Sequence, residues 1–185
     1  MSDTEILLQL FKPRAQVEAI TNSYGKKEVT LTEAQQPDSR VKINHLHSDA
    51  VIINVDKFEG PHHVFNCDTG VCKRADYVII SESARVILYV ELKSASHRNS
   101  DVVNQLKGAK CFIGYCKEIV RLFWSENNFM DNYKERYVSF VEISASQRPV
   151  FSQSSPVHDT SSAFLKIKRP NRSFQSFNKL VGRSS

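Results

Sequence analysis

The stretch that decides the fold is residues 75–93, which read ADYVIISESARVILYVELK. Its two apolar runs, at 75–80 and 85–92, are rich in the branched and aromatic residues that favour β-strands. The SESA segment that joins them is short and polar enough for a hairpin connection. The sequence therefore predicts two adjacent antiparallel strands here.

Three charged residues stand at one end of this predicted hairpin. Glu91 and Lys93 lie two positions apart, so a strand presents both on the same face. Asp76 opens the first strand and falls opposite them if the hairpin pairs. Two carboxylates placed in this way can share Mg²⁺, with Mn²⁺ as a substitute, while Lys93 orients a water or stabilises charge that develops on a phosphate.

The neighbouring segments predict a mixed α/β order of elements. Helical spacing covers residues 4–22, where Pro13 should kink or divide the helix. Short strands are predicted at 28–31 and 50–55, with a loop at 32–40. A long amphipathic helix follows at 101–123, with Gly114 as a point where it can break, and then a strand at 137–143. This order favours a mixed α/β domain over a doubly wound one.

The chain carries Ala75-Asp76, then fourteen intervening residues, then Glu91-Leu92-Lys93 and a predicted helix. This pattern resembles the PD-(D/E)xK nuclease superfamily, which includes restriction, repair and phage-defence enzymes. Ala75 stands where the motif's name has proline. The resemblance implies an α/β fold with a restriction-endonuclease-like core, in which helices flank a central mixed β-sheet. It also implies a Mg²⁺-dependent nuclease that hydrolyses phosphodiester bonds, with DNA favoured over RNA by family habit.

The same resemblance assigns roles to five residues. Asp76 and Glu91 match the metal ligands and Lys93 the catalytic lysine. Gln105, in the following helix, resembles a glutamine that many members use near the active site. Glu18, in the first predicted helix, resembles an additional acidic metal ligand found in some of them. The alternative function is a nuclease-fold module that binds nucleic acid or serves as a scaffold without cleavage.

The C-terminal region concentrates positive charge. The chain has 185 residues and a net charge of +5, and from residue 160 onward it carries six Lys and Arg with no Asp or Glu. We expect a nuclease-like domain at 1–150 and a basic extension at 151–185, packed on or appended to it. Phe164, Phe174 and Phe177 interleave with these charges, which suits nucleic acid. A solvated basic face around core phenylalanines explains the same pattern.

The remaining features bear on location and partners. No stretch is apolar enough to span a bilayer and the first residues lack a secretory signal, so a cytoplasmic protein without membrane contact is expected. A homodimer, or a larger complex with an effector or ATPase subunit, is expected by analogy. Such an ATPase would be a separate chain, because no glycine-rich phosphate loop is present here.

The four cysteines are expected to be free thiols in a reducing compartment. Zinc is an alternative, since two of them, Cys67 and Cys72, follow several histidines in the sequence. The Cys-x4-Cys interval is longer than most structural zinc knuckles. The histidines of this group are His45, His47, His62 and His63.

Overall fold

The computed structural model describes residues 1–33, 36–93, 98–143, 150–153, 157–170 and 174–182. The structure describes the backbone but not the side chains of four strand segments, which are residues 36–39, 143, 151–153 and 169–170. The described chain forms two mixed β-sheets and a few helices, which confirms the predicted α/β class. None of the helices in these ranges has the length and apolar character needed to cross a membrane.

The larger sheet has six strands in the order β4-β5-β6-β7-β9-β8. β5 pairs antiparallel with both β4 and β6, and β7 pairs parallel with β6 and β9. β8 is antiparallel to β9. The bounds are β4 Val51–Asn54, β5 Tyr77–Ser81, β6 Val86–Lys93, β7 Lys134–Ile143, β8 Val150–Gln153 and β9 Leu165–Pro170. The predicted hairpin is confirmed, because Ser81 faces Val86 across its turn.

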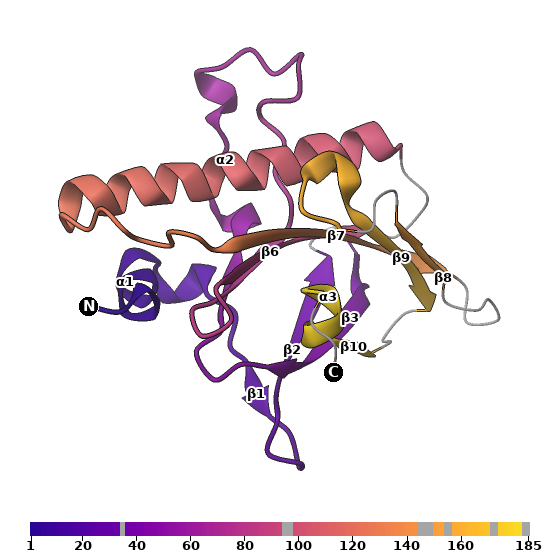
Figure 1. Ribbon diagram of the computed structural model, residues 1–185. Helices are drawn as coiled ribbons and strands as arrows, with labels where there is room; N and C mark the ends of the chain where they lie inside the picture. The colour runs from indigo at the N-terminus through magenta and orange to yellow at the C-terminus, as the bar shows by residue number, and fades with distance from the viewer. Residues whose placement is uncertain (34–35, 94–97, 144–149, 154–156, 171–173, 183–185) are drawn as a thin grey trace.

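One face of this sheet is covered by α2 (Asn99–Phe123), which connects β6 to the parallel strand β7 (Figure 1). Alternate side chains of the hairpin, such as Val78 and Tyr89, share a core cluster with residues of α1 (Asp3–Leu10) and α2. The break expected at Gly114 is wrong, because the helix runs through it without interruption. A side chain at Gly114 would meet nothing within 4 Å, so this position faces open space.

The opposite face packs on the smaller sheet, whose order is β1-β2-β3-β10 (Figure 1). Its strands are β1 Ile20–Thr21, β2 Lys27–Glu33, β3 Gln36–Leu46 and β10 Phe174–Ser176. The second core cluster joins Ile79 and Leu88 of the hairpin to Val29 and Ile43 of this sheet. The loop predicted at 32–40 is wrong for every residue of it that the structure describes, because β2 runs to Glu33 and β3 begins at Gln36.

The first predicted helix is much shorter than expected. α1 starts at a capping box formed by Ser2 and Glu5 and ends at Leu10. Pro13 cannot donate a helical hydrogen bond, and the chain instead forms the 3-10 helix η1 (Pro13–Ala15). The described residues form three more short 3-10 helices, η2 Val55–Lys57, η3 Pro61–His63 and η4 Ser161–Ala163.

Residues after 150 contribute to both sheets. β10 pairs parallel with β3, and the short helix α3 (Phe177–Leu180) buries Phe177 and Leu180 in the second core cluster. Phe164 is also buried. Of the three basic-region phenylalanines, only Phe174 is exposed, with the Lys42 ammonium 5.3 Å from its ring centre. Two of the three are therefore core residues, which is the structural explanation of the sequence pattern.

Candidate active site

The β5–β6 hairpin places Asp76 opposite Glu91. Tyr77 pairs with Val90, so the residue before Tyr77 continues the ladder toward Glu91. The Leu92 backbone N–H donates to Asp76 Oδ2 at 2.6 Å, and the Val55 N–H donates to the Asp76 carbonyl at 2.8 Å. Asp76 is thus held between the start of η2, directly after β4, and β6.

Glu91 and Lys93 share the face of β6 that α2 covers, since Ile87 and Tyr89 of the same alternation pack in the core beneath that helix. The Lys93 ammonium forms an ion pair with Glu91 Oε1. Glu91 is fully buried, whereas 11% of the Lys93 side chain is exposed. Lys93 is therefore the member of this pair that can meet a ligand from solvent.

Three buried oxygens here have no hydrogen-bond partner among the described residues. Two belong to the Glu91 carboxylate, of which Oε1 is ion-paired with Lys93 and Oε2 is not. The third is the hydroxyl of Ser139, which faces Glu91 across the parallel β6–β7 pair. An unpartnered buried oxygen costs about 1–3 kcal/mol, and more when it is charged. This centre therefore gains stability from any cation or donor that reaches these atoms.

The two carboxyl groups resist ionisation where they stand. Burial raises the pKa of Asp76 to about 7, against the opposing effect of the Leu92 N–H. Burial and the nearby Asp76 charge raise the pKa of Glu91 well above its usual range, although Lys93 opposes them. A divalent cation between two such carboxylates would favour their charged forms.

These residues fit a hard divalent ion. Mg²⁺ takes one or two protein carboxylates and completes its octahedron with waters and substrate phosphate oxygens. Asp76 and Glu91 supply the carboxylates, and Glu91 Oε2 is the oxygen without a partner. In the part of the chain that the structure describes, no three His, Cys, Asp or Glu side chains gather as a ready-made metal cage. Water and phosphate would hold the remaining positions.

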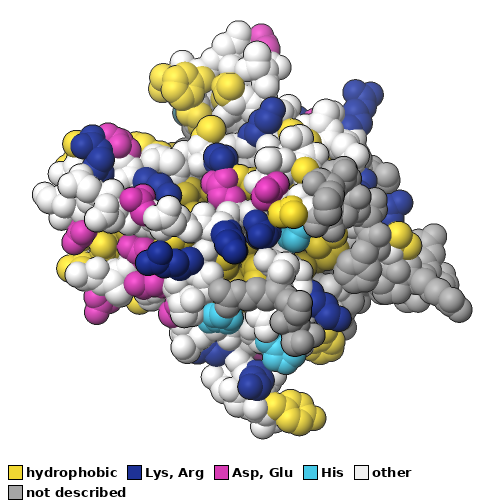
Figure 2. Space-filling model, viewed as in Figure 1, with side chains coloured by type: hydrophobic (Ala, Val, Ile, Leu, Met, Phe, Trp, Pro, Cys, Tyr) yellow, Lys and Arg dark blue, Asp and Glu magenta, His cyan; other side chains and the backbone are white. Residues whose placement is uncertain are grey.

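A cavity of about 430 Å³ opens at this centre. Asp76, Lys93 and Gln105 all line it, so α2 brings the predicted glutamine to the predicted acid and lysine. Glu91 lies beneath the cavity wall and is not among its lining residues. On the face seen in Figure 2, acidic and basic side chains are intermixed rather than gathered into one broad patch of a single sign.

Other cavity residues were missed from the sequence. Asp56 and Lys57 reach the cavity from η2, and Glu33 reaches it from the end of β2. Arg74 also lines the cavity, from the segment before β5; the sequence does indicate this residue, because the basic pair Lys73-Arg74 just before Asp76 can flank a nucleic-acid backbone that crosses the site. The negative charge of Asp56 raises the pKa of both Asp76 and Glu91. A signal for Asp56 was available, because it directly follows the predicted strand at 50–55 as an acid at the end of an apolar run.

Glu18 does not belong to this site. It is exposed, it lies in the non-helical segment between η1 and β1, and it does not line the cavity. The expectation of an acid on the first helix is wrong because that helix stops at Leu10, before Pro13. The Val17 N–H then bonds the Ile52 carbonyl at 2.8 Å, so the chain runs alongside β4.

The cysteine expectation also requires correction. Cys67 and Cys72 are joined by a disulfide with their Cα atoms 5.3 Å apart, whereas Cys111 and Cys116 are free. The five-residue spacing permits this closure because the intervening chain turns at Gly70, which has a φ of +82°. Bonded sulfurs are not thiolate ligands, and the histidines His45 and His47 instead approach the hydroxyls of Ser176 and Ser83.

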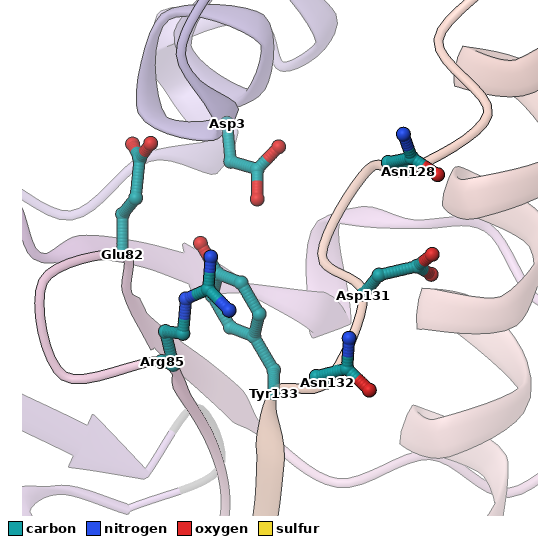
Figure 3. Close-up of a pocket in the computed structure, with 7 residues that line it drawn as sticks. All are labelled: Asp3, Glu82, Arg85, Asn128, Asp131, Asn132 and Tyr133. Atoms are coloured by element: carbon teal, nitrogen blue, oxygen red, sulfur yellow. The ribbon is translucent and has the colours of Figure 1, made fainter.

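A second polar cavity, of about 230 Å³, lies between α1, the β5–β6 turn and the loop at 128–133 (Figure 3). Arg85 and Tyr133 reach into it below Asp3. Two of its carboxylates already accept backbone hydrogen bonds, Asp3 from Met130 N at 3.0 Å and Glu82 from Thr4 N at 2.9 Å. These bonds tie α1 to the turn and the loop, which is a structural role.

No protein-family model, no curated protein and no solved structure matches this chain.

Proposed function

We propose that this protein is a Mg²⁺-dependent nuclease of the PD-(D/E)xK type that hydrolyses phosphodiester bonds, with DNA as the favoured substrate. The observation that carries the proposal is the placement of Asp76 opposite Glu91 and Lys93, beside a cavity that Gln105 also lines. The order α1-β4-β5-β6-α2-β7, with two antiparallel neighbours and then a parallel one, supports a restriction-endonuclease-like core.

Each residue then has a distinct task. Asp76, fixed by the Leu92 N–H, and Glu91, with its unpartnered oxygen, would hold the ion. Bound Mg²⁺ would supply charge neutralisation at the scissile phosphate and acidify a water. Lys93, exposed at the cavity, would orient that water and donate to a phosphoryl oxygen as charge develops. The Gln105 amide and the Arg74 guanidinium would position the backbone.

The decisive test is cleavage of single- and double-stranded DNA and RNA with Mg²⁺ or Mn²⁺. Lys93→Ala should abolish cleavage while the protein stays folded, although loss of the ion pair with the buried Glu91 should lower its unfolding temperature. Lys134→Ala is the matched control, since Lys134 is exposed at the opposite end of the β6–β7 pair and should keep full activity.

Wild-type inactivity on all four substrates with both ions would contradict the proposal. Nucleic-acid binding that survives Glu91→Gln, with no Mn²⁺ uptake that depends on Asp76, would favour the binding or scaffold module instead. Calorimetric titration with Mn²⁺ separates the two functions.

A further inference from the structure

An apolar cavity of about 350 Å³ opens next to the acid centre formed by Asp76 and Glu91, between α2 and the segment at 58–74. Its walls are largely aromatic. The rings of Phe58 and Phe112 lie 5.0 Å apart, and those of Phe58 and Tyr115 lie 6.3 Å apart. Phe65 and Tyr115 remain 58% and 56% exposed, so two large ring faces at this cavity meet water rather than protein.

Close backbone packing preforms this cavity. A side chain at Gly108 would meet the Lys73 carbonyl oxygen at 1.7 Å, so the 70–74 segment lies directly on α2 because this helix position has no side chain. A side chain at Gly60 would meet the Arg74 guanidinium at 2.0 Å. The Cys67–Cys72 disulfide closes the loop that carries the outer wall. In Figure 1 this loop projects beyond α2, and Figure 2 shows hydrophobic side chains gathered on it.

Arg74 belongs to both cavities. It lines the acid cavity with Asp76 and Lys93, and its guanidinium lies 5.7 Å from the centre of the Phe58 ring in the apolar cavity. A ligand that fills both cavities must carry an anion near Arg74 and a flat apolar group beside it. A nucleotide within a strand meets this requirement, because phosphate and base are one sugar apart and bases stack on aromatic and guanidinium planes.

We propose that the apolar cavity binds one unstacked nucleobase of a single-stranded or frayed nucleic acid whose adjacent phosphate lies at the acid centre. This inference rests on the proposed function and deepens it by naming the substrate class. A base inside an intact duplex is paired and stacked, so entry requires it to leave the helix at a cost in free energy. The protein therefore prefers single strands, loops and frayed ends to blunt duplexes.

The test measures binding of fluorescent oligonucleotides to Lys93→Ala protein, which separates binding from cleavage. Tyr115→Ala and Phe65→Ala should each weaken binding of single-stranded DNA by about tenfold, because stacking on an aromatic ring contributes that order of affinity per base. The dependence of affinity on salt should stay unchanged, because the phosphate contacts remain. Phe123→Ala is the matched control, since Phe123 is an exposed aromatic on α2 outside the cavity.

A series of strands with one abasic nucleotide at successive positions provides a second, independent measurement. One position should lose about as much affinity as Tyr115→Ala causes, and that loss should vanish in the Tyr115→Ala protein. Unchanged binding by both pocket variants, or equal affinity for single strands and blunt duplex, would overturn the base-binding proposal. If the pocket variants bind like wild type and the enzyme still cleaves, only the base-binding proposal is contradicted. If an abasic nucleotide at one position weakens binding but the wild-type protein does not cleave, only the nuclease proposal is contradicted.

Discussion

The buried carboxyl of Asp76 makes stability depend on pH in a direction opposite to that of a salt-bridged surface acid. Its pKa rises from 3.8 to about 7 on folding, mainly through burial. Between these two values the folded protein holds a proton that the unfolded chain releases, so the free energy of unfolding falls as pH rises. One pKa unit corresponds to about 1.4 kcal/mol, which gives a loss of about 3 kcal/mol from about pH 5 to about pH 8.

Asp76→Asn should remove most of this loss. The amide carries no charge, and its oxygen can still accept the Leu92 N–H. In EDTA the variant should be the more stable protein at about pH 8 and similar to wild type at about pH 5. Urea unfolding followed by circular dichroism measures both values, and Asp131→Asn, at an exposed acid, should leave the wild-type slope intact.

Excess Mg²⁺ adds an independent check. Under the proposed function the ion would bind the charged carboxylates of the folded state, so it should restore stability to wild type at about pH 8 and do little for Asp76→Asn. A wild-type free energy of unfolding that stays flat or rises over this pH range in EDTA would refute the reasoning. An unchanged slope in Asp76→Asn would do the same.

Three further predictions concern the stability of the protein, and two of them have a matched control variant. Asp56→Asn should move the wild-type stability transition to lower pH, because the Asp56 charge raises the pKa of Asp76; the same pH series in EDTA checks it. Gly108→Ala should lower the free energy of unfolding, measured with urea, by about 1–3 kcal/mol, because its side chain would clash with the Lys73 carbonyl. Gly114→Ala is the control and should stabilise α2 by about 0.5–1 kcal/mol. Equal effects of the two substitutions would contradict the packing described. Removal of residues 160–185 should abolish cooperative unfolding because the core loses Phe177 and its neighbours, while Lys168→Glu should remain folded by calorimetry.

The parts of the fold that sequence predicts are those fixed by local pattern. The hairpin follows from two apolar runs and a short polar turn, and α2 follows from its periodic apolar residues. β3 was missed, because residues 32–40 are polar and contain proline, while the strand is stabilised by Val41 and Ile43 in a core shared with distant strands. α1 was predicted too long because apolar spacing continues beyond Pro13 into a segment that pairs with β4.

The residues of the candidate site likewise fall into those that the local sequence pattern predicts and those that it does not. Asp76, Glu91 and Lys93 lie on one hairpin, so spacing and alternation place them together. Gln105 follows because the crossover helix begins soon after β6. Asp56 and Glu33 reach the cavity only through the pairing of β4 with β5 and the packing of one sheet on the other, and those long-range contacts leave no local pattern. The disulfide was missed because free thiols were expected in a reducing compartment, whereas the short loop between Cys67 and Cys72 brings the two sulfurs together.

The parallel pairing of β10 with β3 affects how the chain is made as well as how it is held. Phe174 meets Lys42, a residue synthesised about 130 positions earlier. Until residues 174–176 have left the ribosome, β3 keeps an open hydrogen-bonding edge and its core neighbours stay exposed to water. Contacts so distant in sequence form slowly. Chaperone dependence during synthesis should therefore centre on this edge, and a ribosome stalled before residues 174–176 have emerged would leave an aggregation-prone intermediate.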